Sequence, residues 1–440
     1  MTLPQGWANC RLQDVTSKIG SGATPRGGRD SYGRGKIPLI RSMNVRFTGF
    51  DDEGLALIDE EQACALDNVT VRSGDVLLNI TGASIGRVCL APDRMDGARV
   101  NQHVCIIRPE YALPVYVGKF LSSPRIQSFI LDENYGLTRQ ALTKGMVEQI
   151  SLPLPPVAEQ RRIVAKLDAL IARLARARAE LDRVPVMASK LRRGVLTELF
   201  ALTDEQAGCT TTAELCDSIT DGDHQAPPKA AAGVPFITIS AMNDGRIDLS
   251  RATRFVPPDY FASLKDTRRP RTGDVLYSVT GSFGIPALVR TDEPFVFQRH
   301  IAILRPAPHR CDPEWLAYAL AAPQVRAQAE EIATGTAQMT VPLKGLRAFS
   351  LPRLGMAEQR KQVVYLDAAF ARADRLEDEA ARARTLLDRL EAAILTKAFR
   401  GELVPQDPND EPASVLLDRI RAERAAAPKP KRGRARKAVG

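Results

Sequence analysis

Polar side chains able to hydrogen-bond to the edges of nucleic-acid bases follow several predicted strands of this 440-residue chain. Arg and Lys favour guanine, and Asn and Gln favour adenine, so such residues on loops that enter a groove can read a base sequence. The candidates in the first half of the chain are Arg41, Asn44, Thr81, Ser84, Arg87, Asn101, Gln102, His103, Arg139, Gln140 and Lys144. Those in the second half are Asp223, His224, Asn243, Ser282, Gln298, Arg299, His300, Gln338 and Lys344. For any one of them the alternative is a turn residue or a strand cap.

Motifs for catalysis are incomplete. Residues 28–33 have the glycine spacing of a phosphate loop, but Arg34 and Gly35 stand where a Lys and a Ser or Thr are needed. The Pro-Pro-aromatic motif of base methylation is absent, and Pro92-Asp93 is not followed by the acid-x-Lys of a nuclease metal site. The histidines and cysteines show no metal-motif spacing, so we expect the cysteines to be ordinary buried thiols. We therefore expect no catalytic residue, no metal and no cofactor bound by this chain itself.

The net charge of +9 is concentrated at one end of the chain. Residues 428–440 carry six Lys and Arg and no acid, so the other 427 residues have a net charge of only +3. We expect this tail to be disordered, either as a solubilising end or as a non-specific contact to phosphates. No apolar run is long enough to span a membrane, and residues 1–7 lack the pattern of a signal peptide, so we expect a cytoplasmic protein.

The chain repeats itself with a period close to 199 residues. Several phrases return in the same order, which identifies a tandem duplication. They are residues 74–77 and 273–276, 101–104 and 298–301, 151–153 and 350–352, 158–161 and 357–360, and 195–197 and 394–396. In each copy a strand-rich region with Gly and Pro breaks precedes a helical one.

The helical part of each copy has a heptad pattern of apolar residues. The apolar positions are Val164, Leu167, Ile171, Leu174 and Leu181 in the first copy, and Val363, Leu366, Phe370, Ala373, Ala380, Leu387 and Ile394 in the second. Pro185 is expected to break or kink the first helix, with a shorter one resuming through Phe200. The second can run unbroken from about Met356 to Phe399, roughly 65 Å at ~1.5 Å per residue. Neither helix can bury its stripe alone, so we expect the two to pack antiparallel, related by a pseudo-two-fold axis.

The predicted fold class is α+β, with two similar globular domains joined by two long antiparallel coiled-coil regions. The boundaries are 1–155 for the first globular domain, 156–203 for the central helical spacer, 204–355 for the second globular domain, 356–400 for the C-terminal helical spacer and 401–440 for an extension that ends in the basic tail.

Several phrases resemble one known family. The start Leu3-Pro4-Gln5-Gly6-Trp7, the Leu-Pro-Leu-Pro-Pro-x-Ala-Glu-Gln-Arg phrase at 152–161, Asp221-Gly222-Asp223-His224 and the ending at 401–413 are similar to the specificity (S) subunits of type I restriction–modification systems. The resemblance covers nearly the whole chain, short of the basic tail. The Ala-Glu-Gln-Arg phrase is the more specific signal because it occurs twice, each time before a heptad helix.

The resemblance implies that each globular part is a target recognition domain reading one half of a bipartite site in double-stranded DNA. The helices would set the spacing between the halves and dock two methyltransferase (M) subunits, with translocase–nuclease (R) subunits completing the restriction complex. S-adenosylmethionine, ATP and magnesium would then be bound by these partner subunits. Because the two sets of polar candidates are not identical, we expect an asymmetric target.

Two other classes of function are compatible with parts of the pattern. An enzyme that binds and also cuts or methylates DNA in one chain would need a Gly-rich cofactor motif or a metal–carboxylate cluster. A scaffold whose helices bind only proteins would show no dependence on DNA.

Overall fold

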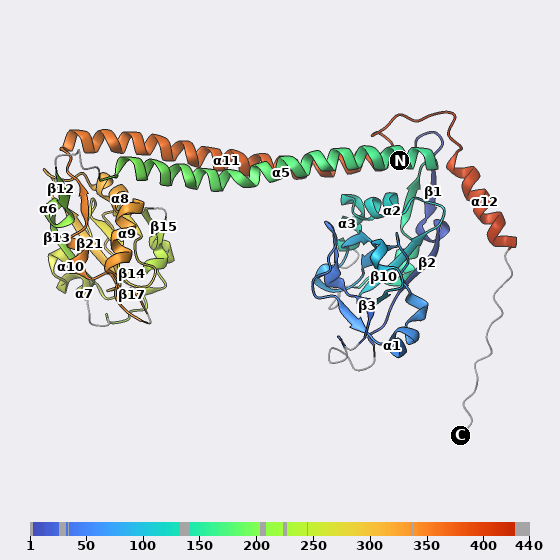
Figure 1. The fold of residues 1–440 in the computed structure, drawn as a ribbon, viewed down its shortest axis with the longest axis horizontal. Coiled ribbons are helices and arrows are strands. Elements are labelled where there is room, and N and C mark those ends of the chain that lie inside the picture. The colour runs from blue at the N-terminus through green and yellow to red at the C-terminus, as the bar shows by residue number, and fades with distance from the viewer. Residues whose placement is uncertain are drawn as a thin grey trace, which may run out of the picture. The chain divides into compact units, whose positions relative to one another are not determined.

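The computed structural model describes residues 3–25, 32–33, 35–132, 141–202, 208–222, 227–243, 245–336 and 338–426 (Figure 1). The chain divides into two compact units. Unit 1 is Met1–Ala179 with Ala383–Gly440, and unit 2 is Glu180–Arg382. Each unit therefore combines one globular domain with a segment from each of the two long helices.

The globular domain of unit 1 is built on two sheets. Strands β2 (Thr16–Ser21), β10 (Val104–Pro109), β7 (Val76–Asn79) and β8 (Val88–Leu90) form an antiparallel sheet in this order. Strands β6 (Ala56–Ile58), β3 (Ile37–Ile40) and β9 (Arg99–Val100) form the second sheet, in which β3 and β9 run parallel. Two short pairs are β1 (Ala8–Arg11) with β11 (Ser151–Leu154) and β4 (Val45–Arg46) with β5 (Gly49–Phe50). The helices are α1 (Glu60–Ala65), α2 (Pro114–Leu121), α3 (Pro124–Asp132) and α4 (Lys144–Glu148).

The globular domain of unit 2 has the same strand order. Its sheets are β13 (Cys216–Asp221), β21 (Ile301–Pro306), β18 (Val275–Ser278) and β19 (Pro286–Leu288), and β17 (Arg254–Val256), β14 (Val234–Ile237) and β20 (Val296–Phe297). The short pairs are β12 (Cys209–Thr211) with β22 (Ser350–Pro352) and β15 (Met242–Asn243) with β16 (Arg246–Ile247). The helices are α6 (Thr212–Leu215), α7 (Pro258–Ser263), α8 (Pro313–Ala321), α9 (Pro323–Ile332) and α10 (Leu343–Arg347). The predicted α+β tandem repeat is confirmed.

The repeated Gly-Asp and Arg-Pro phrases form a buried ion pair in each domain. Asp75 accepts two hydrogen bonds from Arg108, both 2.7 Å long, and only 2% of Asp75 is exposed. Asp274 accepts the equivalent pair from Arg305, at 3.0 and 2.9 Å. A bidentate pair of this kind fixes the start of one central strand to the end of its neighbour. These repeated residues are therefore structural.

The repeated glutamine connects each long helix to its own domain. Gln160 accepts a hydrogen bond from the Leu113 amide at 2.9 Å and donates to the Pro155 carbonyl at 3.0 Å. Gln359 does the same with the Asp312 amide at 2.8 Å and the Leu354 carbonyl at 2.9 Å. Since both glutamines are fully buried, the first turn of each long helix is held against the helix α2 or α8 that follows Leu113 or Asp312.

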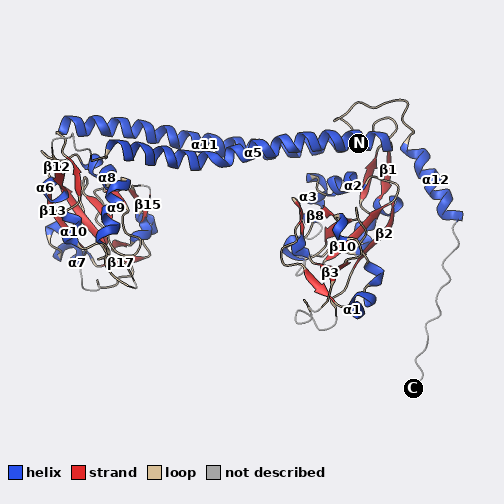
Figure 2. Ribbon diagram, viewed as in Figure 1, coloured by secondary structure: helices blue, strands red, loops and turns tan. Residues whose placement is uncertain are grey.

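The two long helices, α5 (Val157–Leu199) and α11 (Met356–Arg400), lie side by side (Figure 2). In unit 1 the core contains Leu167 and Leu174 of α5 together with Leu395 of α11. In unit 2 it contains Leu196 of α5 together with Leu366 of α11. The beginning of each helix therefore packs with the end of the other, which is the predicted antiparallel arrangement of the apolar stripes.

The prediction that Pro185 would break the first helix is wrong. Helix α5 runs without interruption through Pro185, whose side chain is exposed. A proline inside a helix removes one backbone hydrogen bond and costs about 3 kcal/mol. Burial of Leu174 before it and of Ala188 and Val195 after it holds the backbone helical on both sides and offsets this cost.

A C-terminal helix that the sequence did not reveal, α12 (Ala413–Ala426), packs on the globular domain of unit 1. The Ala413 amide donates to the Gly6 carbonyl at 2.9 Å, and Leu417 and Ile420 are 5% and 2% exposed in the core of unit 1. Arg424 donates to the carbonyl oxygens of Gln13 and Thr16, at 3.1 and 3.0 Å. The basic tail lies outside the described residues.

Three further expectations can be compared with the structure. Five of the seven cysteines are buried, but Cys64 and Cys209 are exposed, so the prediction of buried thiols is wrong for these two. In the described part of the chain, no three His, Cys, Asp or Glu side chains are grouped so that they could hold a metal ion. No helix among the described residues has the length and apolar content needed to cross a membrane.

Candidate nucleic-acid interface

Loops at the ends of the strands bring several of the candidate residues together in each domain. In unit 1 the Ile80 amide donates to the His103 carbonyl at 3.0 Å, and the Leu142 amide donates to the Ile80 carbonyl at 2.8 Å. In unit 2 the Val279 amide donates to the His300 carbonyl, and the Val341 amide to the Val279 carbonyl, both at 2.8 Å. The same three loops are thus tied together in both domains.

A fourth loop joins them. The Asn101 amide donates to the Ile40 carbonyl, and the Gln298 amide to the Ile237 carbonyl, both at 3.1 Å. We call these segments the strand-end loops. They are residues 40–44, 80–84, 101–103 and 141–143 in unit 1, and 237–243, 279–283, 298–300 and 338–342 in unit 2. Candidates from distant parts of the sequence therefore share one edge of each domain.

The histidines of the strand-end loops are fixed by neighbouring polar groups. His103 is hydrogen-bonded through Nδ1 to the Thr81 hydroxyl and through Nε2 to the Gln102 amide, at 2.9 Å for the latter. The Gln298 amide lies 2.9 Å from His300 Nδ1. Burial, and then the neighbouring Arg299, lower the pKa of His300, which favours a neutral ring with one donor and one acceptor.

Asn44 and Asn101 are buried and hydrogen-bond within the loops. Asn44 is fully buried and donates to the carbonyl oxygens of Asp51 and Glu53, at 2.9 and 3.2 Å. Asn101 is 6% exposed, and its side-chain oxygen accepts from the His103 amide at 3.0 Å. These hydrogen bonds shape the loops, and since Asn44 is fully buried it is not placed to contact a base in this structure.

The remaining candidates are distributed as follows. Arg41 is half-buried, donates to the Gly54 carbonyl and lies over the Tyr32 ring at 5.4 Å. Lys144 is exposed at the start of α4, directly after the strand-end loop 141–143, and lies 3.4 Å from Glu148 in a hollow that Lys18 also lines. Thr81, Ser84, Arg87, Gln102, His103, Gln298 and His300 are half-buried, whereas Asn243, Ser282, Arg299, Gln338 and Lys344 are exposed. Arg139, Gln140, Asp223 and His224 lie outside the described residues.

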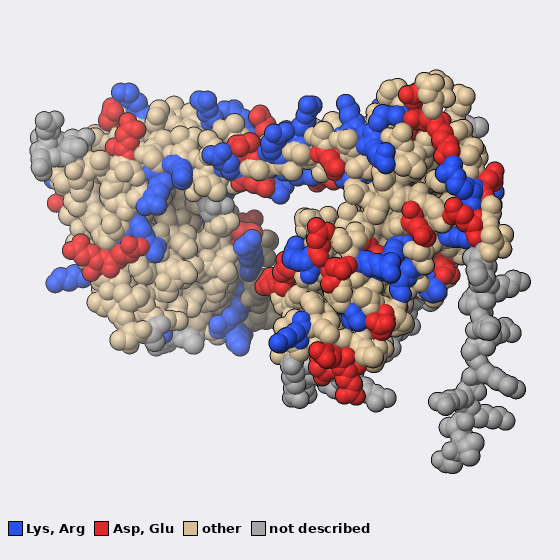
Figure 3. Space-filling view, turned by 45° about the vertical axis from the view of Figure 1, so that its right-hand side comes forward, with Lys and Arg blue, Asp and Glu red and all other residues tan. Residues whose placement is uncertain are grey.

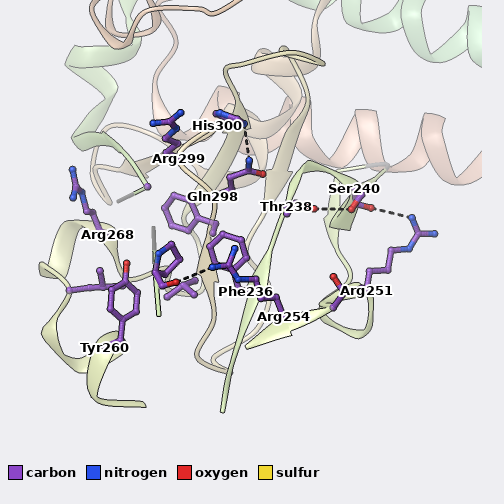
Figure 4. Close-up of a pocket in the computed structure, with 16 residues that line it drawn as sticks. Phe236, Thr238, Ser240, Arg251, Arg254, Tyr260, Arg268, Gln298, Arg299 and His300 are labelled. Carbon is purple, nitrogen blue, oxygen red and sulfur yellow. Dashed lines mark hydrogen bonds between the residues drawn. The ribbon is translucent and has the colours of Figure 1, made fainter. Parts of the chain in front are cut away.

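A cavity of about 510 Å³ in unit 2 adjoins the loop of Gln298, Arg299 and His300 (Figure 4). Its walls also carry Tyr260 and the arginines Arg251, Arg254 and Arg268, which come from different elements. These four side chains were not among the sequence candidates.

Arg254 is the most constrained of these arginines. Its guanidinium lies over the Phe236 ring at 5.0 Å, and its Nη2 donates to the Pro227 carbonyl at 2.9 Å. Its Nε is buried with no acceptor among the described atoms. A buried donor without an acceptor costs free energy, which marks this as a strained part of the cavity wall.

The other two arginines at the cavity wall are held by partners of their own. Arg268 lies 3.6 Å from Asp221, and Arg251 donates to the Ser240 carbonyl at 3.2 Å. A cavity with several guanidinium groups and few acids suits a ligand rich in acceptors, such as a phosphate or the edge of a guanine.

Strand register shows why sequence reasoning missed Arg254. In unit 2, Phe236 of β14 is paired with Arg254 of β17. At the equivalent place in unit 1, Leu39 of β3 is paired with Ala56 of β6. Searching for polar residues shared by both copies overlooks a residue that only one copy has. The available signal was the opposite one, an arginine replacing an apolar residue at a matched strand position.

Known proteins resemble this chain over most of its length. A family profile described as "Type I restriction modification DNA specificity domain" matches residues 4–183, the first globular domain and the start of α5. The EcoBI specificity subunit of a type I restriction enzyme of Escherichia coli is 28% identical in an alignment 469 positions long, gaps included, which covers 97% of this chain and 94% of that relative. The EcoKI specificity subunit of Escherichia coli strain K12 is 24% identical and covers 97% of both chains.

Solved structures agree with these matches. The crystal structure of the HsdS subunit from Thermoanaerobacter tengcongensis has a TM-score of 0.62 and 26% identity, over 92% of this chain and 99% of that one. The chain belongs to the type I restriction–modification specificity subunits. A chain from a structural study of complex assembly and conformational transition in the type I R-M system shares the fold of this specificity subunit, with a TM-score of 0.69, 24% identity and coverage of 92% and 100%.

The specificity subunit supplies the recognition of a DNA sequence within a type I restriction–modification complex. Its curated relatives are named specificity subunits, a role that is not catalytic. The profile match lies in the first copy, and the second copy has the same strand order.

Charge is mixed along the helices of this specificity subunit. On the face in view, Lys and Arg side chains alternate with Asp and Glu along the helices (Figure 3). Such a surface is solvated and does not by itself attract DNA strongly. The basic groups that line the cavity of unit 2 are a more specific feature than the charge of the whole chain.

Proposed function

We propose that each globular domain reads one half of a bipartite, asymmetric target in double-stranded DNA through its strand-end loops. In this proposal the first domain reads one half-site and the second domain reads the other. The two long helices set the spacing between the half-sites.

The observation that carries this proposal is a difference between two domains of one fold. The pair Phe236–Arg254 occupies the place of Leu39–Ala56, so the two domains offer different chemistry at a matched position. Different side chains on the same scaffold would select different bases, because base identity is read from donor and acceptor patterns. A duplicated reader that has diverged in this way is suited to an asymmetric site.

The cavity of unit 2 is suited to an acceptor-rich part of the second half-site. The Arg254 side chain lines this cavity, and Gln298 and Arg299 lie on the adjoining strand-end loop. A guanine presents two acceptors in the major groove, and an arginine can contact both. We propose that Arg254 or Arg299 makes such a contact.

We also propose that the helices dock two methyltransferase subunits, to which translocase–nuclease subunits add. Met187 and Leu191 on α5 are 62% and 40% exposed in unit 2. Their counterparts in the 199-residue repeat, Leu386 and Leu390 on α11, are 60% and 48% exposed in unit 1. Each unit thus presents an apolar pair at the same repeat position, which suits two copies of one partner.

The chemistry of modification and cleavage belongs to the partners in this proposal. S-adenosylmethionine would be bound by the methyltransferase subunits, and ATP and magnesium by the partner subunits of the restriction complex. Because its proposed ligand is cellular or invading DNA, we place the protein in the cytoplasm.

Mapping of methylated bases in cells that express the chain with its methyltransferase tests the assignment of half-sites. Arg254→Ala should relax one position of the second half-site, since a bidentate contact discriminates by about 1–3 kcal/mol, or roughly tenfold to hundredfold. Arg87→Ala, in the first domain, should change only the first half-site. If both variants altered the same half-site, or if neither altered any, the division of labour between the domains would be wrong.

A further inference from the structure

Two ion-pair clusters connect the long helices, one in each unit. In unit 1 Arg178 of α5 lies 2.6 Å from Glu391 and 2.7 Å from Asp388, both of α11. In unit 2 Arg192 of α5 lies 2.6 Å from Glu377 of α11 and also contacts Asp374. Both clusters thus take their arginine from α5 and their acids from α11.

The repeat relates these two clusters residue by residue. With the 199-residue period, Arg178 corresponds to Glu377, and Arg192 corresponds to Glu391. The period holds on both sides of them, because Leu167 matches Leu366 and Leu196 matches Leu395. The pairs Arg178–Glu391 and Glu377–Arg192 are therefore equivalent contacts in which the signs of the charges are exchanged between the two copies.

The stripes of the two helices are both apolar, although their side chains differ in size at some positions, such as Leu174 in α5 and its counterpart Ala373 in α11. Leu167 of α5 matches Leu366 of α11, and Phe200, directly after α5, matches Phe399 near the end of α11. An antiparallel pair of two α5 helices, or of two α11 helices, from different molecules would bring the same kinds of stripe together. Hydrophobic burial alone would therefore permit both like and unlike pairs.

The charges do distinguish them. In a pair of two α5 helices with the same register, Arg178 of one molecule would face Arg192 of the other. In a pair of two α11 helices, Glu377 would face Glu391. The side chains of Arg178 and Glu391 are 26% and 29% exposed, and those of Arg192 and Glu377 are 24% and 32% exposed. Like charges at such partly buried positions repel more strongly than on an open surface.

The arginines respond to these partners. Hydrogen bonding to Glu391 is the largest cause that raises the pKa of Arg178, and hydrogen bonding to Glu377 is the largest that raises the pKa of Arg192. The favourable partner of each arginine is thus the acid that occupies, in the second copy, the position equivalent to the other arginine. Asp388 and Asp374 add to the same sign on α11.

We propose that the exchanged charges at positions 178, 192, 377 and 391 direct α5 to pair with α11 and prevent two copies of this chain from pairing like helix with like helix. Charges beside an apolar seam commonly select partners in paired helices, by attraction in the correct pair and repulsion in the wrong one. The device lets a duplicated sequence keep two similar helices without forming intermolecular dimers. It is independent of which DNA sequence the domains read.

The test uses full-length chains in which each cluster keeps one acid. Asp374→Ala and Asp388→Ser install the residues that the first copy has at these positions and give the reference chain. On this reference, Arg178→Glu with Arg192→Glu makes both helices acidic, and Glu377→Arg with Glu391→Arg makes both basic. The combination of all four changes restores opposite charges with the signs inverted. Arg176→Glu with Arg193→Glu, at exposed positions of α5, is the matched control for net charge.

We expect the melting midpoint of each like-charged chain to fall by several degrees relative to that of the reference chain. The four-fold variant, which carries all four charge changes, and the Arg176→Glu, Arg193→Glu control should melt close to the reference. When the acidic and basic chains carry different tags and are produced together, they should copurify as a one-to-one dimer, since each then offers the other an opposite charge. The reference chain, tagged in two ways, should not copurify with itself. The proposal is overturned if the four-fold variant melts as low as the like-charged chains, or if the acidic and basic chains remain separate.

Discussion

Phe399, in the last turn of α11, packs edge-on against Tyr116 of α2, with ring centroids 5.4 Å apart. The equivalent residue of the first copy, Phe200, at the end of α5, packs against Trp315 of α8 at 5.5 Å. The helix of each copy therefore ends in the domain of the other copy. Each unit is completed by a side chain from the other copy of the duplication.

Phe399→Ala should loosen the domain of unit 1, and Phe200→Ala the domain of unit 2. Phe to Ala in a core costs about 3–5 kcal/mol, and since Phe399 is only partly buried we expect about 2–3 kcal/mol for it and more for Phe200. Hydrogen exchange measured by peptide should rise around residues 114–121 in the first variant and 313–321 in the second. Faster exchange in the same domain for both variants would contradict the reciprocal packing.

Asp75→Ala should destabilise unit 1 strongly, because it leaves Arg108 without the partner of a buried pair. The Asp75 side chain is 1% exposed and that of Arg108 is 16% exposed, and breaking such a pair costs about 3–5 kcal/mol. Denaturant unfolding measures the loss. Asp217→Ala breaks the Arg310–Asp217 pair, whose side chains are 57% and 53% exposed, and should change the unfolding curve little. An equal effect of the two changes would show that burial does not decide the strength of these pairs.

Glu159→Gln should remove a pH dependence from the stability of unit 1. Glu159 accepts from the Trp7 indole at 3.0 Å, and burial raises the pKa of its carboxyl. A raised pKa means that the folded state binds more protons than the unfolded state. The protonated Glu159 carboxyl therefore contributes its full stabilisation of the folded state below about pH 4.3, near the ordinary pKa of a glutamate. This stabilisation is lost as pH rises through the raised pKa.

Melting midpoints between pH 4 and 8 measure this effect. The natural chain should lose stability across the lower part of the range relative to the Glu159→Gln variant, and the two curves should run parallel above it. Glu358→Gln is the matched control, since Glu358 is the repeat equivalent of Glu159 and its side chain is 49% exposed. A slope that persists in the Glu159→Gln variant would rule out Glu159 as its source.

Removal of residues 413–440 should destabilise unit 1, whereas removal of residues 427–440 should not. The longer deletion takes away Leu417 and Ile420 and the hydrogen bond from the Ala413 amide to Gly6. The shorter one keeps every described contact of α12. Limited proteolysis should cut the globular domain of unit 1 faster after the longer deletion only. Equal resistance of both truncated chains would mean that α12 is dispensable for this core.

Much of the fold could be predicted because the duplication tests every assignment twice. The heptad stripes, the Gly-Asp turns and the Gln160 and Gln359 phrases recur in register, so local signals reinforce one another. Burial of Leu167, Leu174, Leu366 and Ala373 agrees with the stripes. Pro185 was misjudged because its local cost was weighed without the packing on both sides.

The candidate site was harder to predict, for two physical reasons. Polar residues that follow strands can form their hydrogen bonds inside the fold, as Asn44 does with two loop carbonyl oxygens. The sequence does not show which polar residues do this and which remain free to contact DNA. Arg254 lies within a strand and is exposed to the cavity only because of how β14 and β17 pair. Helix α12 buries Ala413, Leu417 and Ile420, which have helical spacing, but the sequence does not show that this short stripe packs on the first domain.

The position of α12 has a consequence for how the protein is made. Leu417 and Ile420 belong to the core that also contains Leu12 and Val15, near the opposite end of the chain. A ribosome must therefore synthesise nearly the entire polypeptide before the first domain can close its interior. The domain that emerges first is completed last, so during synthesis it exposes apolar surface that chaperones could bind.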